Sequence, residues 1–402
     1  MSEDISNFII DKIDDDNEVM KDGLEANDFG NEDDNIFSGR PSKPLNHRPF
    51  FSVVIACYNS KKHISKALQS IVNQHMNDDI EVILVDDCST EDYSDQIEPF
   101  NDILSIKRYK TEYNFCPGNT KQKGASEATG QWLCFCDHDD LFIENAFQTV
   151  KQAIINSGEE YYVMSKFVQE DIENEKLIMC IDQPLGWTHG KFYNLDNLWN
   201  KFKISYPKDL TSHEDIAITT QTNCIFKFLN REATFVDDYT YIWNFRSDST
   251  SKQIYHDKET NMDYHFLEFY YDDYLKSTGW IYIDQFKKQN IPADYTIYMC
   301  AQVLIYAYSY MQSFLFYRPH TYLRRNVIYA GEFLAEVKRL FSVNNQTIWN
   351  IMANDGAQLF CEAMPTSFIG SNDYIPTQTI KQWMDMIDPD YQEQEYKIKV
   401  NS

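Results

Sequence analysis

Residues Trp132–Asp140 constrain the fold of this chain more than any other stretch, because an apolar run passes directly into a group of carboxylates. The run Trp132–Cys136 has the length and composition of a buried strand. In an open α/β sheet, ligands bind just outside the carboxyl ends of the strands. We therefore expect Asp137, Asp139 and Asp140 to lie at a ligand-binding edge of such a sheet.

Three carboxylates at one edge have two interpretations. Like charges this close repel one another, and a hard divalent cation between them removes the repulsion. Carboxylate oxygens are the ligands that Mg²⁺ and Mn²⁺ prefer. The alternative is a solvated acidic turn that binds nothing, which is common in an acidic protein. The residues of this stretch alone leave both interpretations open.

The charge and the cysteines of the chain limit the class of protein. The formal net charge is −26 at pH 7, with much of the excess near the N-terminus. Because such a surface repels phosphate backbones, we expect no general nucleic-acid binding. The nine cysteines form no paired CxxC zinc pattern, and the acidic N-terminus has no signal-peptide pattern. A reducing, cytoplasmic location is expected.

Residues 298–317 raise the question of a membrane, because they carry no charge and several arginines follow them. The segment also contains tyrosines, glutamines and serines, which make it amphipathic. We interpret it as a packed core helix. At most, we expect peripheral association at the inner face of a membrane.

Three regions follow from the patterns along the chain. Residues 1–46 are acidic with little to bury, and are expected to form a disordered tail and linker. Residues 47–250 alternate predicted strands and helices, which implies an α/β domain with a parallel sheet covered on both faces. Residues 251–402 are expected to form an α-helical C-terminal domain, whose aromatic residues could supply a core, an acceptor groove or a homo-oligomer interface. The expected strands are 51–57, 81–85, 104–109 and 132–136, and the expected helices are 64–72, 117–129, 264–275, 298–317, 323–341 and 347–363.

A second acidic pair, Asp86-Asp87, also follows a predicted strand, so parallel packing brings two acidic clusters to one edge. This is typical of a nucleotide site, but the chain lacks GxGxxG and GxxxxGK[ST]. Together with later segments, these acids resemble the inverting glycosyltransferases of family 2. The resemblance implies the GT-A fold, which has a Rossmann-like, mostly parallel sheet flanked by helices. The matching motifs are Ser52–Asn59, Val85–Thr90, Asp137–Asp140, Gly186–Tyr193, His213–Ile216 and Tyr241–Ser249.

The resemblance implies a site for a nucleotide-sugar donor. Its DxD motif, matched by Asp137 and Asp139, binds Mn²⁺ or Mg²⁺ on the donor diphosphate. Lys121 stands where the family often has arginine, so a point charge replaces a bidentate fork. Further donor contacts are implied for Tyr58, Asn59, Asp86 and Asp87. Lys191, His189 and Arg246 could also reach the donor phosphates. The alternatives are solvated loop positions for Lys191 and His189, and pairing with a surface acid for Arg246.

The resemblance also implies residues on the acceptor side. Asp215 matches the catalytic base, which takes a proton from the acceptor hydroxyl. Its neighbour Glu214 and the aromatic Trp187 are assigned to the acceptor, with core packing as the alternative for Trp187. His138 and His213 are expected to lie beside the metal ligands or in solvent.

The function implied is metal-dependent inverting transfer of a sugar from a nucleotide sugar, a UDP-sugar above all, to a hydroxyl on a glycan, envelope polymer or glycoprotein. One alternative is a glycosyltransferase acting on modified DNA bases, which the acidic charge disfavours. Another is a catalytically silent GT-A module. The carboxylates of the DxD motif and Asp215 argue against silence, because only the chemistry needs them.

Overall fold

A computed structural model describes most of the N-terminal half of the chain and separate segments of the C-terminal half. The expected tail, residues 1–39, lies outside the described residues. The chain divides into two compact units, Met1–Asp209 with Leu229–Ser249 and Leu210–Phe228 with Thr250–Ser402, and each is described by itself. The described residues are 40, 42–114, 116–182, 187–207, 210, 214–247, 249, 254–257, 262–265, 283, 287, 293–294, 296–301, 303–304, 320–343 and 348.

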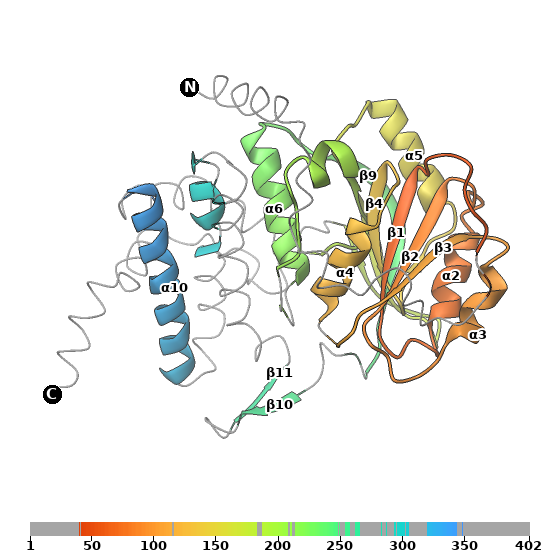
Figure 1. The fold of residues 1–402 in the computed structure, drawn as a ribbon, viewed down its shortest axis with the longest axis horizontal. Helices are drawn as coiled ribbons and strands as arrows, with labels where there is room; N and C mark the ends of the chain where they lie inside the picture. The colour runs from red at the N-terminus through yellow and green to blue at the C-terminus, as the bar shows by residue number, and fades with distance from the viewer. Residues whose placement is uncertain are drawn as a thin grey trace, which may run out of the picture. The chain divides into compact units, whose positions relative to one another are not determined.

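The first unit contains the predicted parallel sheet (Figure 1). Its first four strands are parallel, in the order β3-β2-β1-β4, so the predicted strands and their direction are confirmed. Each of β1, β2 and β4 is an almost continuous apolar run, as expected for strands buried on both faces. The strands are β1 (Phe51–Cys57), β2 (Ile80–Asp86), β3 (Ser105–Lys110) and β4 (Trp132–Asp137).

Beyond β4 the sheet becomes mixed, which the sequence did not reveal. β8 joins β4 in the antiparallel direction, and β6 pairs antiparallel with β8 but parallel with β9. The two remaining strands, β5 and β7, pair antiparallel with β9 and β6. These strands are β5 (Leu141–Phe142), β6 (Tyr162–Asp171), β7 (Lys176–Ile181), β8 (Lys191–Asn194) and β9 (Thr234–Asn244).

Helices cover both faces of the parallel strands. Val53 and Ile55 of β1 belong to a large apolar core that includes Ile64 and Leu68 of α2. Val54 points to the other face, where it meets Gly124 of α4 so closely that a Cβ there would lie 2.3 Å from Val54 Cγ1. The helices of this unit are α2 (Ile64–Val72), α3 (Ser94–Ile97), the short η1 (Glu98–Phe100), α4 (Pro117–Ser126), α5 (Ala146–Ser157) and the π-helical η2 (Leu195–Asn200).

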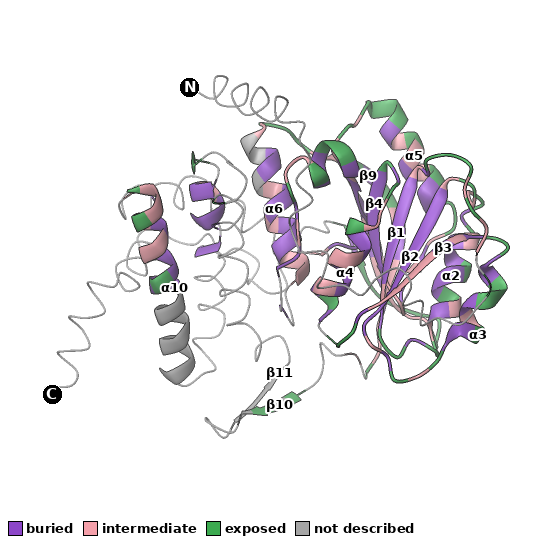
Figure 2. Ribbon diagram, in the orientation of Figure 1, coloured by how far each residue is buried: buried purple, intermediate pink, exposed green. Residues whose placement is uncertain are grey.

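The central strands β1 and β4 are buried (Figure 2), and they carry free thiols. Cys57, Cys134 and Cys136 lie on the two central strands β1 and β4, and each is 1% exposed. Burial raises the pKa of Cys134 and of Cys136 well above the ordinary value of 9.0. These residues pack as small apolar side chains.

Residues 40 and 42–46, expected to be linker, pack on the first unit. The Ser42 hydroxyl donates to the Ile106 carbonyl at 2.8 Å and accepts from the Ile106 N–H at 2.8 Å. The Lys43 N–H donates to the Asn101 carbonyl at 2.6 Å. The folded part of this unit therefore begins before residue 47, because backbone groups of the edge strand β3 form hydrogen bonds with this segment.

The second unit contains two described helices and a hairpin, and its residues 293–294, 296–301 and 303–304 are also helical. The two helices and the hairpin strands are α6 (Glu214–Phe228), β10 (Ile254–Asp257), β11 (Met262–His265) and α10 (His320–Phe341). The predicted helix 323–341 falls within α10. The helix predicted at 264–275 is wrong at Tyr264 and His265, because both pair with β10 in an antiparallel hairpin. Its other residues, most of 298–317 and nearly all of 347–363 lie outside the described residues.

Within the described parts of the chain, no helix combines the length and the apolar character that crossing a membrane requires.

Candidate active site

The two predicted acidic clusters meet at one edge of the sheet, because β1 lies between β2 and β4. All three strands are parallel, so the turns that follow them leave the sheet on the same side. These turns are residues 58–63 after β1, 87–93 after β2 and 138–140 after β4. Three separate parts of the sequence therefore supply one site.

Asn59 fixes the turn after β1 against the turn after β2. Its φ of 48° is left-handed, a conformation that asparagine tolerates. The Asn59 N–H donates to Ser89 Oγ at 2.8 Å, and Asn59 Oδ1 accepts from the Thr90 N–H at 3.1 Å. Tyr58 beside it is 44% exposed. Asn59 therefore shapes the site, while the Tyr58 ring remains accessible from solvent.

Asp86 and Asp87 are both buried and hydrogen-bonded, and Asp86 lines a small cavity. Asp86 is 2% exposed and accepts hydrogen bonds from the Ser89 N–H at 3.1 Å, the Ser89 hydroxyl and the Tyr93 hydroxyl at 2.6 Å. Lys110 Nζ lies 3.4 Å from Asp86 Oδ2. Asp87 is 6% exposed and accepts from Thr111 Oγ1 at 3.1 Å. The cavity has a volume of ≈ 240 Å³ and is lined by Asp86, Ser89, Thr90, Glu91, Asp92, Tyr93 and Lys110.

Asp137 and Lys121 are brought together, although 15 positions separate them in the sequence. Lys121 Nζ lies 3.3 Å from Asp137 Oδ1. The Lys121 side chain is 3% exposed, whereas that of Asp137 is 36% exposed. The carboxylate is therefore both paired with a buried cation and open to a ligand.

The other acids of the turn after β4 have partners from β9 and the residues after it. The Tyr241 hydroxyl donates to Asp140 Oδ2 at 2.6 Å, and the Asn244 N–H donates to Asp140 Oδ1 at 2.8 Å. Arg246 Nη1 lies 3.0 Å from Asp139 Oδ2. Arg246, which we expected at the donor phosphates, thus lies beside the predicted metal ligand Asp139.

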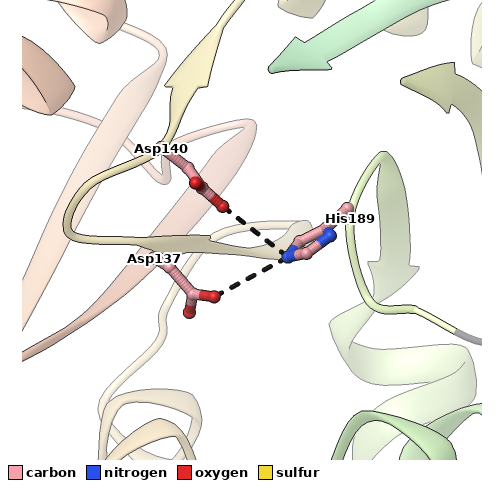
Figure 3. A group of neighbouring side chains, drawn as sticks. All are labelled: Asp137, Asp140 and His189. Carbon is pink, nitrogen blue, oxygen red and sulfur yellow. Dashed lines mark ion pairs between the residues drawn. The ribbon is translucent and has the colours of Figure 1, made fainter. Parts of the chain in front are cut away.

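His189 completes a group of possible metal ligands (Figure 3). Its Nε2 lies 3.7 Å from Asp137 Oδ2 and 3.7 Å from Asp140 Oδ2. The ligand atoms of the three residues all lie within 4.8 Å of one another. His189 is 5% exposed, yet neither ring nitrogen has a hydrogen-bond partner. An imidazole nitrogen and two carboxylates suit a divalent ion such as Mn²⁺, so the residues fit the predicted metal.

The pKa values of the two carboxylates in this group are shifted in opposite directions. Burial and the charges of Asp139 and Asp137 raise the pKa of Asp140 well above its usual range. Burial also opposes ionisation of Asp137, but Lys121 and His189 outweigh it and hold the pKa of Asp137 well below its usual range. A cation between the two carboxylates would favour the ionised form of both.

Of the remaining candidates, Lys191 and Trp187 lie in the first unit, whereas Glu214 and Asp215 lie in the second. Lys191 of β8 is 1% exposed, and the half-buried Trp187 lies 6.3 Å from Trp243 between ring centroids. Glu214 and Asp215 form the first turn of α6, as the predicted helix start requires, but belong to the second unit. Their position relative to the acidic cluster therefore stays a prediction. His213 lies outside the described residues.

Two residues of the site were missed by sequence reasoning. Tyr241 and Asn244 belong to a motif that was recognised, but no role was assigned to either residue. A tyrosine within a strand is typical of a packed core, and Asn244 acts through its backbone N–H. The contact between residue 244 and Asp140 therefore cannot be predicted from the side chain at position 244.

Comparisons with known proteins show what the chain is similar to. Residues 52–228 match the family model described as Glycosyl transferase family 2. The poly(ribitol-phosphate) beta-N-acetylglucosaminyltransferase TarS of Staphylococcus aureus is 35% identical over 105 residues, 26% of this chain and 18% of TarS. A poly(ribitol-phosphate) beta-glucosyltransferase of Bacillus spizizenii is 28% identical over 206 residues, 48% of this chain and 32% of that protein. The chain thus matches less than a third of the length of either relative.

The solved structures confirm the expected GT-A fold. The crystal structure of S. aureus TarS 1-349 in complex with UDP-GlcNAc gives a TM-score of 0.57 at 17% sequence identity. The likeness covers 86% of this chain and 92% of that one. At this identity the likeness concerns the fold alone.

Proposed function

We propose that this chain, whose residues 52–228 belong to glycosyl transferase family 2, transfers a sugar from a UDP-sugar to a hydroxyl of an envelope polymer. The observation that carries the proposal is the meeting of two acidic turns, after β2 and β4, beside a half-exposed carboxylate paired with Lys121. The names of the two relatives above, which act on poly(ribitol-phosphate), support a polymer acceptor. The complex of TarS with UDP-GlcNAc supports a UDP-sugar donor.

The donor would bind across the two acidic turns. The cavity beside Asp86 would hold the base and ribose, because buried carboxylates accept hydrogen bonds from a ring N–H or a ribose hydroxyl. Lys121 and Arg246 supply positive charge near the diphosphate, each already anchored by an acid of the turn after β4. Anchoring reduces the entropy that these side chains lose when the donor binds.

A divalent ion would be held by Asp137 and His189, with Asp139 or Asp140 as the further carboxylate. When bound, such an ion neutralises charge on the departing diphosphate. Asp215 would accept the proton of the acceptor hydroxyl, since an in-line displacement needs a base but no enzyme nucleophile. The first turn of α6 favours the charged form of Asp215 through the helix dipole. The product would carry the inverted anomeric configuration.

The test is release of the nucleoside diphosphate from a panel of UDP- and GDP-sugars, with and without Mn²⁺, in the presence of a poly(polyol phosphate) acceptor. We expect acceptor-stimulated release that needs Mn²⁺ and is lost in Asp137→Asn. A matched control is Asp238→Asn, an exposed acid of β9 away from the turns after β2 and β4. Release of GDP but not UDP would contradict the donor, and the absence of both sugar transfer and nucleotide binding would favour a silent module.

A further inference from the structure

The predicted metal ligands are held in place by a residue beyond the range that the family model matches. That residue is Tyr241 of β9, which lies beyond the matched range 52–228. We propose that Tyr241 is a positioning residue that sets the shape of the turn 137–140 and the orientation of His189. The inference rests on the proposed function, because it concerns the metal site of that function.

The Tyr241 hydroxyl contacts the turn at both ends. It donates to Asp140 Oδ2 at 2.6 Å and accepts the Asp137 N–H at 3.2 Å. The Asp140 N–H also donates to the Asp137 carbonyl at 3.0 Å, which closes the turn. Asp139 lies between these two fixed positions, so the hydroxyl constrains every acid of the motif.

The Tyr241 ring orients the histidine. It stacks on the His189 ring with 4.8 Å between centroids and 13° between planes. The Phe167 ring also packs edge-on against the His189 ring, with 5.3 Å between the ring centroids. Because neither His189 nitrogen has a hydrogen-bond partner, ring contacts rather than hydrogen bonds fix the plane of the imidazole. Tyr241 therefore touches all three members of the possible metal group.

The turn that carries His189 is tied to the same strand. Gly190 has φ +65°, and a Cβ there would lie 2.8 Å from the Ser165 carbonyl oxygen. The Ser165 hydroxyl donates to the Gly190 carbonyl at 2.8 Å and lies 2.5 Å from Thr240 Oγ1. Residues 240 and 241 of β9 thus hold both segments that supply ligands.

Tyr241 is suited to this role because it is a rigid part of the core. It is 0% exposed, so water does not compete for the partners of its hydroxyl. Partners that orient metal ligands typically change metal affinity or activity by about 10- to 100-fold when they are removed. Loss of the Tyr241 hydroxyl should have an effect of this size.

The experiment is Mn²⁺ titration of the full chain by calorimetry, well below the melting temperature, for wild type and Tyr241→Phe. The substitution removes one oxygen and keeps the ring that stacks on His189. We expect Mn²⁺ affinity to fall by about 10-fold or more. UDP affinity in the presence of EDTA should stay at the wild-type value, because the Asp86 cavity is separate from the hydroxyl.

The matched control is Tyr239→Phe on the same strand. The Tyr239 hydroxyl also donates to a carboxylate, Asp182 at 2.7 Å, which is not part of the cluster. Its loss should leave Mn²⁺ affinity unchanged. A purely structural role of Tyr241 would lower thermal stability without changing Mn²⁺ affinity.

The outcomes separate this inference from the proposed function. If wild type binds Mn²⁺ and Tyr241→Phe binds it with equal affinity, the inference is overturned but the metal site is not. Wild type that does not bind Mn²⁺ overturns the metal site and the inference together. If Tyr241→Phe does not fold in buffer, wild type and variant are both titrated in a stabilising osmolyte such as trimethylamine oxide. Equal Mn²⁺ affinity of the two folded proteins there overturns the inference.

Discussion

The carboxylate of Glu81 ties the central strands together at the end of the sheet opposite the acidic turns. It is 2% exposed near the start of β2 and accepts hydrogen bonds from Ser52 Oγ at 2.5 Å, the Thr129 N–H at 2.6 Å and the Gly130 N–H at 3.1 Å. Lys107 Nζ lies 2.9 Å from its other oxygen. One side chain therefore joins β1, β2, β3 and the residues that lead into β4.

Replacing Glu81 with glutamine removes part of this network. The amide nitrogen cannot accept, so at least one of the donors loses its partner. A hydrogen bond to a charged group contributes about 1.5–3 kcal/mol, and a buried donor left without a partner adds to the loss. Lys107 is 34% exposed, so water replaces much of its interaction. We expect Glu81→Gln to lose about 3 kcal/mol of the free energy of unfolding, which lowers the melting temperature by roughly 6–12 °C.

The effect should depend on pH in one direction. Burial opposes ionisation of Glu81, but Ser52, Thr129 and Lys107 outweigh it, so its pKa lies below the ordinary value of 4.5. A carboxylate with a lowered folded-state pKa stabilises the protein above its unfolded-state value and loses that contribution as the pH falls through the folded-state value. The gap between wild type and Glu81→Gln should therefore be full at pH 7 and shrink below about pH 4.5.

The assay is urea unfolding of both proteins at several pH values, with UDP binding measured at pH 7. UDP affinity should not change, since Glu81 lies at the other end of the strands from the cavity beside Asp86. The control is Glu127→Gln, whose carboxylate is 26% exposed and pairs with Lys123; it should cost less than about 1 kcal/mol. A gap that is absent at pH 7, or that does not shrink in acid, would refute the reasoning.

Three further predictions concern the site and the ends of the first unit. Asp139→Asn should abolish Mn²⁺-dependent UDP binding and keep metal-free UDP binding, measured by calorimetry. If the variant binds UDP as tightly as wild type both with and without Mn²⁺, Asp139 is not a metal ligand. Asp215→Asn should bind donor and metal normally while transfer falls about 10²- to 10⁴-fold, with Glu214→Gln milder; transfer at the wild-type rate, or joint loss of binding and transfer, would contradict the base. A chain that begins at Arg40 should melt like the full chain, whereas one that begins at Asn46 loses the Ser42 contacts and about 1–2 kcal/mol; equal melting temperatures would show that the segment contributes nothing.

The first half of the sheet could be predicted because its signals are local. Apolar runs such as 51–57 and 132–136 match the length of their strands, and the acids that follow must leave the sheet at its carboxyl edge. The pairing of Lys121 on α4 with Asp137 was not predicted, and the donor-side role of Lys121 stays a prediction. Sequence order and strand direction were enough to place the two acidic turns at one edge.

The second half could not be predicted because its contacts join distant segments. Strand β9 inserts beside β6 with two register shifts, and nothing in residues 234–244 alone specifies that partner. His189 joins Asp137 and Asp140 only because β8 runs antiparallel to β4. The helix predicted at 264–275 failed at its start because pairing with β10 outweighs helical periodicity at Tyr264 and His265.

The buried thiols of the two central strands make the opening of the sheet chemically visible. Cys57, Cys134 and Cys136 are closed to solvent in the native fold, and their raised pKa values leave almost no reactive thiolate. An alkylating reagent can reach them only after β1 and β4 separate from their helices. When labelling is faster than reclosing, its rate measures how often the centre of the sheet opens, without any engineered probe. In our proposal, bound UDP-sugar bridges the turns after β2 and β4, the strands on either side of β1, so saturating donor should slow this labelling.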